Sequence, residues 1–428
     1  MIRRHGAAFL AHEGQRLSIH QRKTLALLAI CRTPALGRRV WECDGCGRRA
    51  VIYRSCGDRH CPQCQGAARQ RWLAQRTAEL LPVGYLHVVF TVPEQLHVLA
   101  IGQPRVFYEL LLQATRETLL CVAADPRQLG ARIGGVMVLH TWGQTLQLHP
   151  HVHVIIPGGG LSPDGQRWIS TAADYFLPVK VLSQVFRRKL LSLIAAARRA
   201  GRITFRGGQS QLASRSGFGC WLADLRRRAW VVYCQPPLGG PAQALKYLAR
   251  YTYRVAISNS RIVAVDERQV TFQYKDYAAG GCSRTMRLTG GEFLRRFCQH
   301  ILSRGFVRIR MFGLLCGRGR RRHLAHCREL LAGDATPADA RPTPASDTSA
   351  ALPDSSPAQA APDAPDAPAG TPVANQAVVM PVVKFPSCPD CDRELRLVEE
   401  LCRPSVPTLV RRTFRRDPFG VTAYWNSS

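Results

Sequence analysis

Apolar and polar positions alternate, or form short continuous runs, in the middle part of the chain, and these patterns predict β-strands. The run Tyr85-Leu-His-Val-Val-Phe-Thr-Val reads as a buried strand that ends before Pro93. Residues 134–156 contain two apolar runs joined by polar residues near Gln144, a pattern typical of a β-hairpin. Two further strands are expected at 261–266 and 269–274, joined by a short turn.

Longer segments with apolar residues on one side predict helices. A partial apolar face marks residues 1–40 as helical, and 66–81 read as a basic helix that ends before Pro82. We expect short strands or loops at 203–235. The other expected helices lie at 104–124, 178–200, 240–253, 291–303 and 321–331.

The composition changes after Gly333, where Ala, Pro, Asp, Ser and Thr dominate and Ala-Pro-Asp repeats occur. Such a segment buries too little apolar surface to offset its chain entropy, so we expect a disordered linker. We therefore divide the chain into an N-terminal unit, a larger second unit, the linker and a C-terminal tail. Their bounds are 1–82, 83–332, 333–386 and 387–428.

The chain is strongly basic, with a net charge of +30 over 428 residues. Nine of the 59 basic and 12 of the 29 acidic residues follow residue 333, so residues 1–333 carry a net charge of +33. An acidic polymer is the natural partner of such a surface, although arginines on solvated faces would give the same composition. No apolar run is long enough to cross a membrane and no secretory signal is visible, so we expect a cytoplasmic, nucleoid-associated protein.

Sixteen cysteines in a cytosolic protein favour metal sites over disulfides. Cys43-Asp-Gly-Cys46 and Cys61-Pro-Gln-Cys64 are two Cys-x-x-Cys pairs separated by fourteen residues. Four thiolates at this spacing predict one tetrahedral structural Zn²⁺ site. The candidates for a replacement ligand or a second ion are Cys56, His60 and, more weakly, Cys31. Cys388-Pro-Asp-Cys391 resembles half of another site and would need ligands from elsewhere.

Arginines surround these cysteines and continue into the basic helix that follows. They are Arg48, Arg49, Arg54, Arg59, Arg69 and Arg71. We interpret them as a DNA-binding surface, with a solvated basic scaffold as the alternative.

The second run of the hairpin contains His151 and His153, which alternate along a strand and therefore share one face. If the turn centres on Thr145-Leu146, His140 lies opposite His151, with Cβ atoms about 4.5–5.5 Å apart. Three imidazoles could then bind one catalytic divalent ion, for which we expect Mg²⁺ or Mn²⁺. A shift of the turn by one residue would make Gln144 the third ligand instead.

Tyr247 and Tyr251 lie four residues apart in a segment that reads as a helix, which places both on one helix face. Either phenol could attack a phosphate held near the metal, while the flanking Lys246, Arg250 and Arg254 hold the DNA strand. Ordinary packing of the two tyrosines is the alternative interpretation.

These motifs together resemble the transposases of the bacterial insertion-sequence ninety-one family, which belong to the HUH endonuclease superfamily. The matching stretches run in order through residues 15–330, from the cysteine cluster to Gly305-Phe-Val-Arg-Ile-Arg. The most specific are Leu139-His-Thr-Trp-Gly, His149-Pro-His-Val-His-Val-Ile-Ile-Pro-Gly-Gly-Gly and Lys246-Tyr-Leu-Ala-Arg-Tyr.

The resemblance implies an α+β fold with an N-terminal zinc-binding domain and a catalytic domain built on a central antiparallel sheet flanked by helices. It further implies that His151 and His153 bind the metal and that Tyr247 and Tyr251 are candidate nucleophiles. In this superfamily a tyrosine attacks single-stranded DNA, forms a 5′-phosphotyrosine and supports rolling-circle-type transposition. A relaxase, a replication initiator with the same chemistry, and a non-catalytic zinc-dependent DNA-binding protein are the alternatives.

Overall fold

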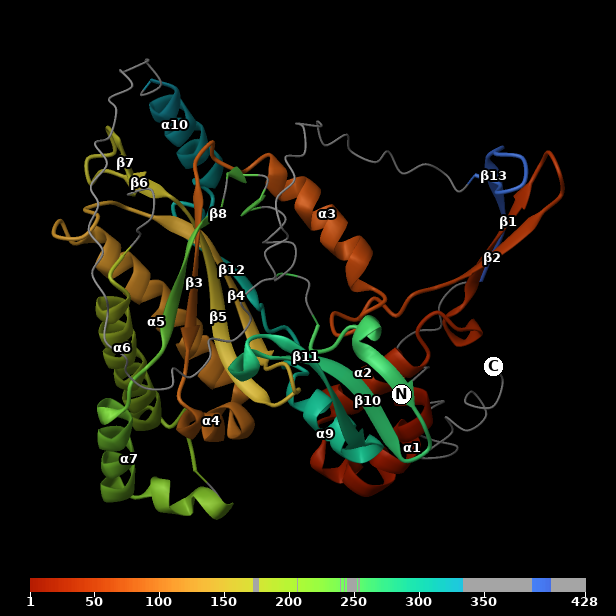
Figure 1. Ribbon diagram of the computed structural model, residues 1–428, viewed down its shortest axis with the longest axis horizontal. Coiled ribbons are helices and arrows are strands. Elements are labelled where there is room, and N and C mark those ends of the chain that lie inside the picture. Colours follow the sequence, from red (N-terminus) through yellow and green to blue (C-terminus); the bar gives the residue numbers. More distant parts are fainter. Residues whose placement is uncertain are drawn as a thin grey trace.

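The computed structural model has the predicted α+β fold, with antiparallel sheets and helices in separate layers (Figure 1). It describes residues 1–171, 177–205, 207–238, 240–241, 243–244, 252, 255–333 and 387–401. The predicted linker therefore lies outside the described residues, as does the tail after residue 401. Among the helices described, none is long and apolar enough to cross a membrane.

The central element is a five-stranded sheet in the order β12-β4-β5-β3-β8, in which every neighbouring pair is antiparallel. The predicted strand and hairpin are confirmed as β3 and as β4 with β5. The strands span β12 Ile309–Gly313, β4 Gly134–Trp142, β5 Leu148–Pro157, β3 Tyr85–Thr91 and β8 Val232–Leu238.

One face of this sheet is covered by helices α5 (Pro104–Ala124), α6 (Val179–Arg199) and α7 (Arg215–Arg227) (Figure 1). Alternate strand residues such as Phe90 and Val152 point into this main core. The short helix α4 (His97–Gly102) closes one end of the core.

The opposite face carries the histidines and a smaller apolar cluster. Tyr85, Val136, Val138 and Ile155 form this cluster, and Trp72 of helix α3 (Gln65–Thr77) packs against it. We call this surface of the sheet the histidine face.

A second sheet packs with the N-terminal helices. It consists of β9 (Ile262–Val265), β10 (Gln269–Asp276) and β11 (Cys282–Thr289). Phe9 of helix α1 and Leu25 of helix α2 share a core with Phe272, Phe293 and Phe297 of β10 and helix α9. The three helices span α1 Ile2–Glu13, α2 Ile19–Ala29 and α9 Gly290–Gln299. The start of the chain is thus built into the same body as residues 262–299.

A third sheet, β13-β1-β2, lies apart from the central sheet (Figure 1). Strands β1 (Arg38–Cys43) and β2 (Arg49–Tyr53) form a hairpin, and β13 (Leu395–Glu400) pairs with the other edge of β1. The remaining elements of the described chain include β6 (Gly159–Leu161), β7 (Trp168–Ser170) and helix α10 (Arg320–Gly333).

The expectation of short strands or loops throughout 203–235 is wrong, because α7 occupies Arg215–Arg227. Ser214 caps this helix by accepting a hydrogen bond of 2.9 Å from the Gly217 N–H. Phe218, Leu222 and Leu225 recur with helical spacing and bury one face of it. The expected helix over 240–253 falls almost entirely outside the described residues.

Candidate functional site

The structure brings the three predicted histidines together. His140 on β4 pairs directly with His151 on β5, as predicted, and His153 follows on the same face. The turn, however, is one residue out of the assumed register, because Trp142 pairs with Leu148. A β-bulge between His140 and Trp142 restores the predicted pairing. All three are at most 1% exposed, and one ring nitrogen from each lies within 4.8 Å of the others. The Cβ spacing of opposed residues in a rigid antiparallel pair explains this convergence.

Hydrogen bonds orient two of the rings. The Nδ1 of His151 lies 2.7 Å from the carbonyl oxygen of His149, and the Nδ1 of His153 lies 2.9 Å from the Nε2 of His87 on β3. If each Nδ1 carries the proton, both Nε2 lone pairs face each other, at 3.1 Å. This is the arrangement in which neutral imidazoles bind a metal while their other nitrogen is held in place.

The geometry fits a metal ion. Two nitrogen ligands about 2.1 Å from one ion at 90–110° lie roughly 3.0–3.4 Å apart, which includes the observed separation. The His140 ring centroid lies 4.5 Å from that of His153 and stacks on Trp142 at 4.7 Å. Divalent transition metals accept imidazole ligands more readily than Mg²⁺ does, so the donor set favours Mn²⁺ over Mg²⁺.

The alternative ligand, Gln144, lies in the turn after β4 instead of at the histidines. Its side-chain amide is 3.5 Å from the Tyr277 hydroxyl, and its carbonyl accepts a hydrogen bond from Arg261. The turn contains a backbone bond from the Gly143 N–H to the Gln147 carbonyl of 3.0 Å. The β-bulge between His140 and Trp142, and not the turn alone, therefore places His140 beside His151 and His153.

Helix α9 and the residue after it hold the same turn from outside. Buried His300 contacts the Leu146 carbonyl through Nε2 at 3.1 Å, and Arg296 donates to the Thr145 carbonyl at 2.9 Å. Burial lowers the pKa of His300 to about 4, so the ring is neutral at physiological pH. Sequence reasoning missed His300 and His87, because their partners are distant in the chain.

The candidate nucleophiles Tyr247 and Tyr251 lie outside the described residues, as do Lys246, Arg250 and Arg254. Residues on either side of the tyrosines are described, however. Ala244 is fully buried in the apolar cluster of the histidine face.

Thr252, immediately after the second tyrosine, is also fully buried. Its carbonyl accepts a 2.7 Å hydrogen bond from Arg308, and the Arg308 carbonyl accepts one of 3.0 Å from the Leu139 N–H on β4. Both sides of the tyrosine segment are therefore attached to the sheet that carries the histidines.

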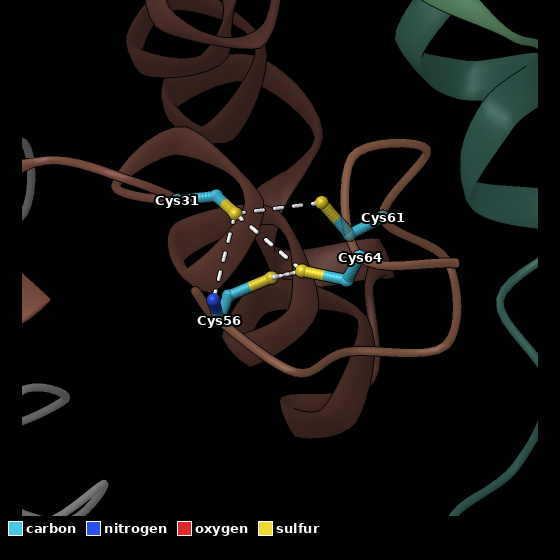
Figure 2. A group of neighbouring side chains, drawn as sticks. All are labelled: Cys31, Cys56, Cys61 and Cys64. Carbon is cyan, nitrogen blue, oxygen red and sulfur yellow. Dashed lines mark hydrogen bonds between the residues drawn. The ribbon is translucent and has the colours of Figure 1, made fainter. Parts of the chain in front are cut away.

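The cysteines form two groups, which we call the inner and the outer cluster. The inner cluster consists of Cys31, Cys56, Cys61 and Cys64 (Figure 2). Its sulfurs lie 3.6 Å apart for Cys31–Cys61 and Cys31–Cys64, and 3.5 Å apart for Cys56–Cys64. Four sulfurs around a tetrahedral zinc lie about 3.8 Å apart, so this cluster fits the ion.

The predicted grouping of Cys43, Cys46, Cys61 and Cys64 in one site is wrong. Cys43 and Cys46 lie with Cys388 and Cys391 in the outer cluster. The reason is that the β1–β2 hairpin carries Cys43 and Cys46 into a separate sheet. The loop after the hairpin instead returns to the end of α2, where Cys31 completes the inner cluster.

His60 is not a ligand in this arrangement. Its Nδ1 lies 2.8 Å from the Asp58 carboxylate, and its Nε2 accepts a 3.3 Å hydrogen bond from the Leu302 N–H. Burial lowers the pKa of His60, which keeps the acceptor nitrogen unprotonated. Neighbouring Arg59 donates to the carbonyls of Leu302 and Ser303 at 3.1 and 2.9 Å. These bonds attach the cysteine loop to the segment after α9.

The arginines around the cysteines divide into two sets. Arg69 and Arg71 are exposed on α3, which begins directly after Cys64. The other four bind within the protein: Arg48 to Asp390, Arg49 to Glu42, Arg54 to Glu400, and Arg59 to backbone carbonyls. Of the predicted set, Arg69 and Arg71 are thus the two exposed arginines for which the described residues give no ion pair or hydrogen-bond partner.

Comparisons with known proteins agree with this architecture. Residues 1–92 match a family model described as "Transposase zinc-binding domain", and residues 134–323 match one described as "Putative transposase". The protein named "Putative transposase y4qJ" of Sinorhizobium fredii is 48% identical over 331 residues, which cover 77% of this chain and 83% of that protein. "Transposase for insertion sequence element IS801" of Pseudomonas savastanoi pv. phaseolicola is 26% identical over 332 residues, covering 73% and 74%. No solved structure matches the chain. The chain belongs to the insertion-sequence ninety-one (IS91) family of transposases.

Proposed function

We propose that this transposase cuts and rejoins single-stranded DNA at element ends through a covalent tyrosine intermediate formed at the histidine face. One observation carries the proposal. Three buried imidazoles converge on this face, and the residues before and after the Tyr247–Tyr251 segment are anchored to the same sheet. The tyrosine nucleophile and the metal site would then both lie at the histidine face.

The reaction exchanges one phosphate ester for another. The phenolic oxygen of Tyr247 or Tyr251 attacks the phosphorus, and the bond to the 3′ oxygen breaks. The tyrosine loses its proton, the leaving oxygen gains one as a 3′ hydroxyl, and the 5′ phosphate stays on the enzyme. Attack by another 3′ hydroxyl reverses the step and joins two strands, as rolling-circle-type transposition requires.

His140, His151 and His153 would hold the divalent ion, which supplies positive charge to a phosphate oxygen in the transition state. The protein's own contribution is orientation, because His149 and His87 fix the two β5 rings before DNA arrives. Lys246, Arg250 and Arg254 would bind phosphates beside the nucleophile.

The inner cluster would hold a structural Zn²⁺. The sulfur spacing supports this, and so does the position of Cys64 at the start of α3. A fixed start of α3 orients exposed Arg69 and Arg71, which we propose contact the DNA backbone, while Trp72 packs on the histidine face.

The test incubates the purified chain with labelled single-stranded oligonucleotides of an element end and Mn²⁺ or Mg²⁺. A protein–DNA adduct that survives denaturation should form with the metal. It should not form when EDTA is present from the start, and it should form when Mn²⁺ is then added in excess of the EDTA. Duplex DNA of the same sequence should give little adduct. The double variant Tyr247→Phe/Tyr251→Phe should give none, whereas Tyr53→Phe, an exposed position on β2, should behave like the parent.

The single variants show whether either tyrosine suffices. An adduct that persists in the double variant contradicts the assignment of the nucleophile. Adduct formation unaffected by replacing His151 and His153 with Ala contradicts the assignment of the metal site.

A further inference from the structure

The outer cluster joins two parts of the chain that are far apart in sequence. Cys43 and Cys46 come from the end of β1 and the turn after it, whereas Cys388 and Cys391 precede β13. The family models match residues 1–92 and 134–323, so neither includes the second pair. We propose that the outer cluster is a second zinc site, closed by the C-terminal tail, which fastens the tail to the N-terminal domain.

The two Cys-x-x-Cys turns have the same backbone geometry. The N–H of Cys43 donates to the Arg48 carbonyl at 2.9 Å, and the N–H of Cys388 donates to the Arg393 carbonyl at 2.7 Å. Each turn also has a bond back to its first cysteine from the residue four positions later, Gly47 or Asp392.

The residues at those two equivalent positions both adopt a left-handed conformation, with φ of 70° for Gly47 and 56° for Asp392. Aspartate is among the few residues besides glycine that adopt this conformation readily, so Asp392 can take the place in the second turn that Gly47 has in the first. Two matched turns that face each other form the two halves of a four-thiolate zinc site.

The sulfur distances agree with a metal ion and exclude disulfides. Cys43 and Cys391 sulfurs lie 3.4 Å apart, Cys46 and Cys388 sulfurs 3.5 Å, and Cys46 and Cys391 sulfurs 3.8 Å. A disulfide requires about 2.05 Å, whereas a tetrahedral zinc site gives about 3.8 Å.

The other contacts at this interface are the antiparallel pairing of β1 with β13, a small buried core and a set of ion pairs. The buried core consists of Cys43, Cys388 and Leu395, with Trp41 and Ala50 packed against it. Ion pairs join Arg38 to Glu399, Arg39 and Arg54 to Glu400, Arg48 to Asp390, and Arg396 to Asp44. These ion pairs are exposed, so each contributes little to stability. Their opposite charges at matched positions nevertheless favour the pairing of this tail with β1 over other pairings. A zinc ion supplies the folding free energy that so small a core lacks.

Closure by the same chain is compatible with the length of the connection. Helix α10 ends at Gly333 and lies near β6 and β7, well apart from β13 (Figure 1). The 53 residues 334–386 can span roughly 170 Å when extended, which is ample for a domain of this size. Zinc at the outer cluster would thus hold Cys388 in place, as α10 holds Gly333, so that both neighbours of residues 334–386 are fixed.

The first measurement is the zinc content of the purified full-length chain. Cys388→Ser/Cys391→Ser should contain one zinc per chain less than the parent. Cys220→Ser/Cys316→Ser, which changes two exposed cysteines outside both clusters, should contain as much as the parent. Unchanged zinc in the first variant would overturn the proposal.

The second measurement tests the attachment itself. A protease site is inserted after Gly370, the chain is cleaved, and the products are separated by gel filtration. The tail fragment should stay with the body of a monomer, and it should be released by a zinc chelator or by Cys388→Ser/Cys391→Ser. Because these substitutions lie in the tail, the N-terminal domain stays intact in the variant. Retention of the serine-substituted fragment, or capture of the tail only within a dimer, would overturn the inference.

Discussion

Replacing His87 with Ala should weaken metal binding at the histidine face without unfolding the protein. His87 is 1% exposed and lies on β3, where its Nε2 is 2.9 Å from the Nδ1 of His153. The two rings also stack, with centroids 5.1 Å apart and planes inclined by 12°. The alanine variant loses both the acceptor and the stacking partner that orient His153.

Two independent estimates give the magnitude. Loss of a group that orients a metal ligand typically lowers metal affinity 10–100-fold, or about 1.4–2.7 kcal/mol. Removing the partner of a buried hydrogen-bonding group costs about 1–3 kcal/mol. The two ranges overlap, so we expect the dissociation constant for Mn²⁺ to rise by between ten and a hundredfold.

The assay measures free Mn²⁺ by electron paramagnetic resonance during titration of the full-length chain. His87→Gln, which keeps an acceptor, should recover part of the affinity. Tyr85→Phe is a matched control on the same strand and face, because it removes the buried hydrogen bond to the Leu81 N–H but touches no ligand. The positioning role would be refuted if His87→Ala bound Mn²⁺ with an affinity within twofold of the parent's, while Tyr85→Phe bound it as tightly as the parent.

Three further predictions concern the inner cluster, the DNA surface and the hairpin turn. Cys31→Ser should lose one zinc per chain and lower the melting temperature, whereas Cys121→Ser, exposed on α5, should change neither; equal zinc in both variants contradicts the inner cluster. Arg69→Ala/Arg71→Ala should weaken single-stranded DNA binding and make the log–log salt dependence shallower by about 1.4, since each phosphate contact contributes about 0.7; an unchanged slope in a filter-binding titration removes them from the interface. Because burial lowers the pKa of His300 from 6.5 to about 4, the unfolded chain binds this proton first as the pH falls, so the folded state loses about 2 kcal/mol between pH 7.5 and 5. The free energy of unfolding of His300→Gln, measured with urea, should lack this part of the pH dependence. If it changed with pH as much as that of the parent, His300 would make no such contribution.

The periodic pattern of apolar residues predicted those helices and strands in which it is regular. The strand at Tyr85 and the hairpin that pairs His140 with His151 are confirmed. The alternation of side chains along strands predicted which residues share a face. The pairing itself matches because a β-bulge between His140 and Trp142 offsets a turn that is one residue out of the assumed register, and nothing in the sequence signals that bulge. Helix α7 was missed because Gly217 and Gly219 and several exposed polar residues weaken its apolar pattern.

The grouping of the cysteines could not be derived from spacing. Cys43 and Cys46 are close in sequence to Cys61 and Cys64, but strand pairing separates them. Their actual neighbours follow more than three hundred residues later in the chain, and the pairing of β13 with β1 brings them together. Spacing indicates that thiolates bind metal, but the tertiary fold decides which pairs share an ion.

The inner cluster and the histidine hairpin are connected by a continuous series of contacts, which argues against an independent zinc module. His60 in the cysteine loop accepts the Leu302 N–H, and His300, two residues earlier, contacts the carbonyl of Leu146 in the hairpin turn. Arg296, one turn before His300, donates to the same turn at Thr145. This turn and the β-bulge between His140 and Trp142 together place His140 opposite His151. If the inner cluster holds zinc as proposed, the loop that it stabilises also supports the three histidines through the 300–302 segment. The N-terminal domain would then contribute to the histidine face as well as to the surface on α3 that we propose binds DNA.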